Sequence, residues 1–209
     1  PEEVQAAAEK GGFDITEIRV IDPANYRRMD ELVDKMVELR KGKMTPEECH
    51  AALLKGNYFG TMLVKMGVAD ALLGGATYST ADTVRPALQL VKTKPGNKSV
   101  SSSFVMIREK GDGTEEKYIM GDCAINIEPT AEEMAECAVE CAHTARIFDI
   151  DPKVAMLSYS TKGSGKGENV DKVRTATELA KAAAPESDID GELQFDAAFS
   201  PVVAQTKCK

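Results

Sequence analysis

The sequence lacks any stretch close to the roughly 20 consecutive apolar residues that a membrane-spanning helix needs. Residues 1–10 are charged and rich in alanine, without the apolar core of a signal peptide. Cytoplasm is therefore the expected compartment, and we expect no membrane partner. With 209 residues, 43% of them hydrophobic, the chain can still bury a core and form one large or two small domains.

Basic residues are in deficit. The 26 Lys and Arg are outnumbered by 34 Asp and Glu, which gives a formal net charge of −8. This balance argues against nucleic acid as a partner and against adhesion to anionic membranes, since both attract basic surfaces. An anionic small substrate would need a local cluster of Arg, Lys and backbone N–H groups that works against the overall field.

Histidine is scarce, and the cysteines do not form an obvious site. His50 and His143 are isolated from any Ser or Cys arrangement that would make a nucleophile. The five cysteines are an odd number in a chain too long to need disulfides, which indicates reduced thiols. Cys137, Cys141 and His143 lie close in sequence, but on an amphipathic segment and short of four ligands. We therefore expect no metal site.

Hydrophobic periodicity alternates between helical and strand-like segments. Helices are expected at residues 26–41, 45–66, 84–92, 130–148 and 169–184, and strands at 18–21, 68–74, 100–107, 117–123 and 154–159. The clearest helix start is Thr45-Pro46-Glu47-Glu48, with Thr as N-cap, Pro at the first position and Glu three residues after the cap. Gly111-Asp112-Gly113 predicts a hairpin between two of the strands.

This alternation predicts an α/β protein with a mostly parallel sheet covered by helices on both faces and the hairpin as an antiparallel addition. The polar segment 93–99 contains Pro95-Gly96 and is the predicted boundary between a domain of residues 1–95 and one of residues 96–209. The chain begins without an initiator Met and stops without a terminal helix, so we expect a piece with structure missing on both sides.

Residues 74–86 join a predicted strand to a helix and are rich in Gly, Ser and Thr. Such a loop gathers N–H groups, hydroxyls and the positive end of a helix, and Arg85 adds a planar cation suited to phosphate. The other interpretation is an ordinary turn in which Asp82 or Thr83 caps the helix and Arg85 is solvated. The pattern leaves both open.

Residues 158–167 read Ser-Tyr-Ser-Thr-Lys-Gly-Ser-Gly-Lys-Gly and superficially resemble a phosphate-binding P-loop. That motif needs Gly where Ser160 stands and Ser or Thr where Gly167 stands, so we exclude a nucleotide triphosphatase site. A loop that touches a phosphate and a plain solvated connector both remain open. Arg40 ends a predicted helix, and from pattern alone it is a cation that complements the helix C-terminus.

Three colinear stretches carry a family resemblance: 38–87, with Ser-Thr-Ala-Asp-Thr-Val-Arg-Pro; 154–164, reading VAMLSYSTKGS; and 190–198, reading DGELQFDAA. Together they cover nearly the whole chain, which resembles the phosphate acetyltransferases. The resemblance implies two α/β domains of the isopropylmalate dehydrogenase-like fold, with both domains incomplete here. It also implies that acetyl phosphate and coenzyme A bind in the cleft between the domains.

The resemblance also implies site residues. Arg40 and Arg85 match two arginines implicated in substrate binding and turnover, which reverses the pattern-based interpretation of Arg40. The remaining substrate-binding residues expected are Ser79, Thr80 and Thr83 around acetyl phosphate, with Ser160, Thr161, Lys162 and Gly163 in the second loop. The family's catalytic serine, its neighbouring arginine and a proposed aspartate base match no position of this sequence.

The implied chemistry is acyl transfer, in which a thiolate attacks the acetyl carbonyl and phosphate leaves. It requires no metal or redox cofactor, because coenzyme A is a substrate, and we expect a homodimer. Phosphate butyryltransferase is the nearest alternative, since a methylene or two changes binding by only about 1 to 3 kcal/mol. A hydroxyacid dehydrogenase of the same fold would need a cluster of carboxylates to bind a divalent metal, and the sequence shows no such cluster. A non-catalytic, ligand-binding remnant of the fold also stays open.

Overall fold

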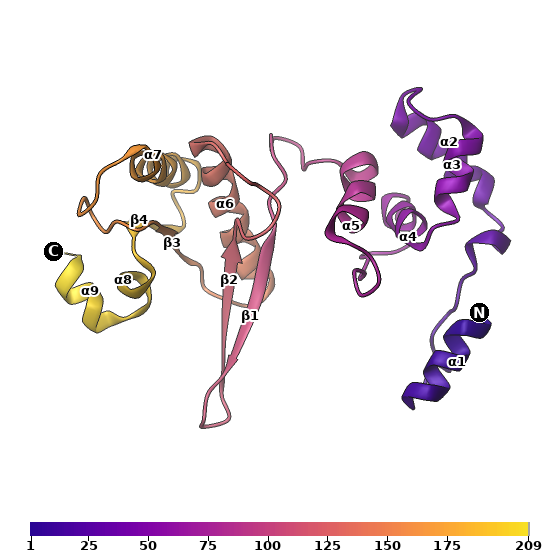
Figure 1. Ribbon diagram of the computed structural model, residues 1–209, viewed down its shortest axis with the longest axis horizontal. Coiled ribbons are helices and arrows are strands. Elements are labelled where there is room, and N and C mark those ends of the chain that lie inside the picture. Colours follow the sequence, from indigo (N-terminus) through magenta and orange to yellow (C-terminus); the bar gives the residue numbers. More distant parts are fainter. Residues whose placement is uncertain (209) are drawn as a thin grey trace. The chain divides into compact units, whose positions relative to one another are not determined.

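The computed structural model describes residues 1–208. The chain forms two compact units, residues 1–92 and residues 93–209. Figure 1 shows the order of their helices and strands. None of the described helices is long and apolar enough to cross a membrane.

The first unit is helical. Its elements are α1 (Glu2–Gly11), η1 (Pro23–Asn25), α2 (Met29–Arg40), α3 (Pro46–Leu53), α4 (Gly56–Lys65), α5 (Thr80–Pro86) and η2 (Ala87–Val91). Residues 1–92 are all described and contain no strand, so the strands expected at 18–21 and 68–74 are wrong. A short apolar run forms a strand where a neighbouring strand completes its hydrogen bonds, and neither run has one here. Leu73, in the second run, is almost fully exposed.

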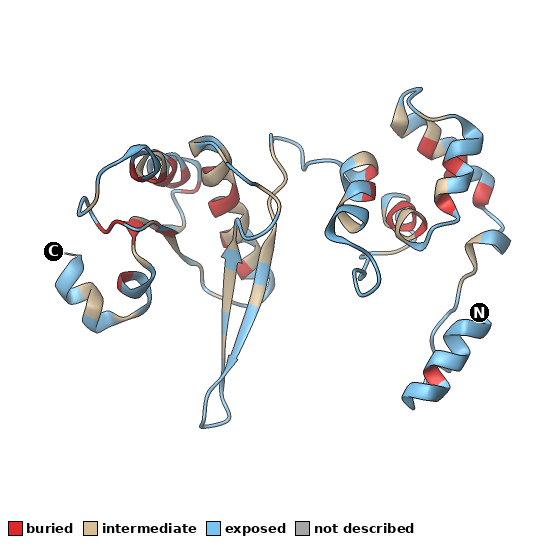
Figure 2. Ribbon diagram, in the orientation of Figure 1, coloured by how far each residue is buried: buried red, intermediate tan, exposed pale blue. Residues whose placement is uncertain are grey.

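The core of the first unit lies between α2, α3, α4 and η2 (Figure 2). It contains Leu32 and Met36 from α2, Leu53 from α3 and Met62 from α4. The expected helix 45–66 is two helices, because the backbone turns to an extended conformation at Lys55, the N-cap of α4. This break lets both short helices direct apolar faces to the same core.

The helix expected at 84–92 starts earlier, at Thr80, so Pro86 ends α5 and does not lie in a first turn as predicted. Proline cannot donate an N–H to continue the α-helical pattern. The chain widens there into the π-helical η2, in which Lys92 N donates to Ala87 O at 2.9 Å.

The second unit contains strands and helices. They are β1 (Ser103–Glu109), β2 (Glu115–Gly121), α6 (Ala131–Ile147), β3 (Lys153–Leu157), α7 (Glu168–Ala183), β4 (Asp188–Leu193), α8 (Phe195–Phe199) and α9 (Pro201–Lys207). The predicted hairpin is confirmed, since β1 and β2 pair antiparallel. β3 and β4 form a separate parallel pair joined by the α7 crossover. The described chain therefore holds two small sheets, and the single, mostly parallel sheet that we expected is wrong for these residues.

Helices α6 and α7 pack against each other beside the β3–β4 pair (Figure 1). Their contact is built largely from small side chains, including Ala138 of α6 and Ala176 of α7, with Met156 of β3 and Ile189 of β4 in the same cluster. Small residues allow close packing. Met156, the buried residue of β3, joins this cluster one residue before the strand ends.

Candidate functional site

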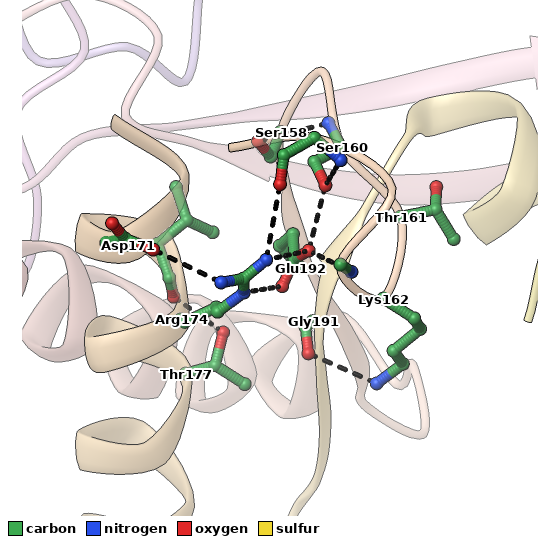
Figure 3. Close-up of polar contacts among 12 residues, drawn as sticks. Ser158, Ser160, Thr161, Lys162, Asp171, Arg174, Thr177, Gly191 and Glu192 are labelled. Atoms are coloured by element: carbon green, nitrogen blue, oxygen red, sulfur yellow. Dashed lines mark hydrogen bonds and ion pairs between the residues drawn. The ribbon is translucent and has the colours of Figure 1, made fainter. Parts of the chain in front are cut away.

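The loop of residues 158–167 folds around the buried carboxylate of Glu192, which lies on β4 (Figure 3). Oε1 of Glu192 accepts hydrogen bonds from Ser160 Oγ at 2.9 Å and from Gly163 N at 2.7 Å. Oε2 accepts one from Arg174 Nε of α7 at 2.9 Å. One acidic side chain thus holds together the loop, a strand and a helix.

The electrostatics of Glu192 follow from these contacts. Burial alone would raise the pKa of its carboxyl, but hydrogen bonds from Arg174, from backbone N–H groups and from Ser160 lower the pKa to about 2. The group is a carboxylate at any ordinary pH. Its charge is balanced by Arg174, whose side chain is 40% exposed.

Several polar groups of the loop bond within it or to residues 192 and 194 at the end of β4. Ser160 Oγ accepts from Gly165 N at 2.8 Å, and Thr161 Oγ1 accepts from Gln194 N at 2.9 Å. The N–H of Lys162 donates to the carbonyl of Glu192 at 3.1 Å. The loop is therefore an ordered, internally bonded turn. The N–H groups of Lys162, Gly163 and Gly165 thus already donate to protein acceptors.

Of the four expected substrate contacts in this loop, Ser160 and Thr161 are buried and their hydroxyls are occupied by Glu192 and Gln194. Lys162 and Gly163 are exposed. The two exposed residues also hold the loop, because Gly163 N donates to Glu192 and the Lys162 ammonium contacts Asp190.

Lys162 has an unusual backbone. Its φ of 46° is left-handed, a conformation that costs a non-glycine residue about 1–2 kcal/mol. Its ammonium contacts the carboxylate of Asp190 and donates to Gly191 O at 3.1 Å. Burial raises the pKa of the Asp190 carboxyl, but hydrogen bonds from Lys162 and from the backbone more than offset this, and the pKa is lowered. An open hollow beside Lys162 is lined by Gly163, Arg174, Glu178, Gly191 and Glu192.

The loop of residues 74–86 leads into α5 in the first unit. Ser79 is the N-cap: its Oγ accepts from Asp82 N at 3.2 Å and donates to Asp82 Oδ2 at 2.7 Å. Thr83 Oγ1 donates to Ser79 O at 3.1 Å. Ser79, Thr80 and Arg85 are exposed. The structure thus brings Ser79 and Thr83 into contact, and the cap expected from Asp82 or Thr83 is supplied by Ser79.

Arg40 is the last residue of α2, and Lys41 after it adopts a left-handed C-cap. The side chain of Arg40 is half-buried, and its Nε is buried without a hydrogen-bond acceptor among the described residues. A cation that merely complements a helix end would be expected in solvent. The buried, unpaired donor instead suits an arginine that meets an external acceptor.

Sequence reasoning missed Glu192 and Arg174. Glu192 lies within the stretch Asp-Gly-Glu-Leu-Gln-Phe, where an acidic residue stands inside a strand-length segment, and this is its one local signal. Arg174 lies on a helix with many exposed charged residues, and no local sequence signal distinguishes it from them. Among the described residues, no three His, Cys, Asp or Glu side chains are grouped so as to hold a metal ion.

Comparison with known proteins identifies the family. The family model described as "Phosphate acetyl/butaryl transferase" matches residues 1–209. The chain belongs to this family. It is 53% identical over 205 residues to the phosphate acetyltransferase of Bacillus subtilis (strain 168), a match that covers 98% of this chain.

Similar solved structures support the same family. The chain is similar to a phosphotransacetylase from Streptococcus pyogenes, with a TM-score of 0.87 and 54% identity over 99% of the chain. It is also similar to the EutD phosphotransacetylase from Staphylococcus aureus, with a TM-score of 0.85 and 52% identity over 99% of the chain. The chain spans 62% of the length of these relatives.

Proposed function

We propose that the protein is a phosphate acetyltransferase, which transfers an acetyl group reversibly between acetyl phosphate and coenzyme A. The observation that carries this proposal is the 53% identity to the Bacillus subtilis phosphate acetyltransferase across 98% of the chain. The proposed substrates are acetyl phosphate, inorganic phosphate and coenzyme A, and the proposed reaction uses no metal or redox cofactor.

In the proposed reaction the coenzyme A thiolate attacks the acetyl carbonyl, negative charge builds on the carbonyl and phosphate oxygens, and phosphate leaves. Arg40 and Arg85 are proposed to stabilise that charge, usually a large contribution in acyl transfer. The unpaired Nε of Arg40 supports its part in this. We propose that Ser79, Thr80 and Thr83 line the acetyl phosphate site, supported by the clustering of Ser79 and Thr83 at the start of α5.

The finer architecture is proposed from the family resemblance. We infer two α/β domains of the isopropylmalate dehydrogenase-like fold, with substrates bound in the cleft between them, in a cytoplasmic homodimer. The domains would meet near residues 95 and 96.

The test is acetyl-CoA formation from acetyl phosphate and coenzyme A by the purified full-length protein, followed by thioester absorbance. Arg40→Gln and Arg85→Gln should each lower kcat/KM at least about tenfold, because a charge-assisted contact is lost. Arg27→Gln removes an exposed arginine before α2 and is the matched control. Absence of thioester, while the Bacillus subtilis relative is active in the same assay, would contradict the proposal. Faster turnover of butyryl phosphate than of acetyl phosphate would identify the protein as a phosphate butyryltransferase instead.

A further inference from the structure

Pro86 leaves a carbonyl of α5 without its usual helical donor. The backbone stays helical through this residue, with φ −59° and ψ −42°, so α5 passes directly into η2. In an α-helix the N–H of residue 86 would donate to the carbonyl of Asp82, four positions earlier, but proline has no N–H. The Asp82 carbonyl therefore needs a donor from elsewhere.

A side chain of α4, which packs against α5, supplies that donor (Figure 1). Asn57 Nδ2 donates to Asp82 O at 2.7 Å, although the two residues are 25 positions apart in the sequence. A carbonyl oxygen can accept only from the nitrogen of the amide, so this contact fixes which way the amide is turned. The other end of the amide, Oδ1, accepts from Tyr58 N at 3.0 Å. Both ends of the half-buried Asn57 side chain are thus bonded.

The next residue of α4 makes a second contact, beyond Pro86. Tyr58 Oη donates to Gln89 Oε1 at 3.0 Å, and Gln89 lies in η2. Consecutive residues of α4 therefore hold the chain on both sides of Pro86, which is itself buried. Arg85 lies between these two contacts, and its residue is exposed. The backbone from which its guanidinium extends is held by side chains of α4.

We propose that Asn57 is a positioning residue: its side-chain amide takes the place of the N–H that Pro86 lacks, and so fixes the part of α5 that carries Arg85. Asn57 acts through the backbone and does not contact the reacting atoms. The part of Arg85 in acetyl transfer rests on the proposed function, whereas the hydrogen bond of Asn57 to α5 does not.

The first measurement is hydrogen–deuterium exchange of the peptide covering residues 79–92 in the full chain, without any substrate. Asn57→Asp keeps the shape of the side chain and its Oδ1 acceptor but removes the donor to Asp82 O. Exchange in this peptide should rise about tenfold, because α5 opens locally. Asn169→Asp, the same change at an exposed position of α7, should leave it unchanged. Unchanged exchange in a folded Asn57→Asp protein would show that water serves the Asp82 carbonyl equally well, and would overturn the inference.

The second measurement tests whether Asn57 stands in for the N–H missing at Pro86. Pro86→Ala returns an N–H to the backbone, so in that background Asn57→Asp should change the exchange by less than about twofold. An equal rise in both backgrounds would overturn the inference, because the amide would then act independently of the proline. Pro86 is buried, and if Pro86→Ala does not fold, the first measurement alone decides.

The third measurement separates positioning from stability. Asn57→Asp should lower kcat/KM for acetyl phosphate about tenfold, but less than about twofold in an Arg85→Gln background, because the two changes act on the same guanidinium. An equal fall in both backgrounds, or no fall while exchange rises, would overturn the positioning role and leave the proposed function standing. If the wild type forms no thioester, the proposed function fails, and the two exchange measurements still decide whether Asn57 holds α5.

Discussion

Arg174 donates to Glu192 through Nε at 2.9 Å, and this contact joins α7 to β4 at the point where the 158–167 loop turns. A carboxylate whose pKa is lowered by folding stabilises the protein above its unfolded pKa, and this contribution is lost as the pH falls through its folded pKa. For Glu192 these limits are 4.5 and about 2.

Glu192→Gln should therefore remove part of the acid sensitivity of the second unit. Between about pH 4.5 and pH 2 the wild type should lose stability more steeply than the variant, because only the wild type must protonate this group to unfold. Chemical denaturation at a series of pH values measures the two slopes. Parallel slopes would show that Glu192 titrates normally.

Gly191→Ala should destabilise the protein by about 1–3 kcal/mol, since this position tolerates no side chain. A Cβ at Gly191 would lie 2.6 Å from Met156 Cβ and 3.0 Å from the Met156 carbonyl oxygen, which belongs to packed backbone of β3. Gly111→Ala is the matched control, because a Cβ there meets nothing within 4 Å. Thermal unfolding compares the two variants, and equal midpoints would contradict the expectation.

Thr130→Ala should cost about 1 kcal/mol by removing the cap of α6. Thr130 Oγ1 accepts from Glu133 N at 3.2 Å, and Thr130 N donates to the Glu133 carboxylate at 2.9 Å. Thr130→Ser keeps the hydroxyl and should retain most of the stability. Urea denaturation of the three proteins tests this, and a Ser variant as unstable as the Ala variant would exclude the cap as the cause.

The protein should not bind Mg-ATP as a P-loop protein does, because the N–H groups of Lys162, Gly163 and Gly165 already donate to Glu192 on β4 or to Ser160. Calorimetry with Mg-ATP should show no submicromolar binding. Tight binding that disappears in Lys166→Ala would refute this interpretation.

Local signals predicted local structure. The capping box at Thr45 and the hairpin around Asp112-Gly113 depend on residues within a few positions of each other, and both are present. Residues 68–74 looked equally regular, but a strand needs a distant partner, and the described chain supplies none. Periodicity cannot reveal whether that partner exists.

In the candidate site, too, local features could be predicted from the sequence and long-range contacts could not. The composition of the 158–167 loop predicted a candidate site there. Ser160 and Glu192 meet, however, only because the α7 crossover brings β4 back beside β3. Two residues that come into contact across such a crossover have no regular spacing in the sequence, so periodicity does not predict their contact. For the same reason, sequence alone could not distinguish Ser160 and Thr161, which are buried, from Lys162, which is exposed.

The left-handed backbone of Lys162 has a consequence for engineering this protein. Stabilisation by design often replaces non-glycine residues at positive φ with Gly or Asn, which accept that conformation more readily. Such a scan would select Lys162, whose φ is 46°. The substitution would relieve the backbone and at the same time delete the ammonium that contacts Asp190 and donates to Gly191 O. The relief of the backbone is therefore offset by the loss of a link between the loop and β4, and a scan that considers φ alone would overestimate the stability gained at position 162.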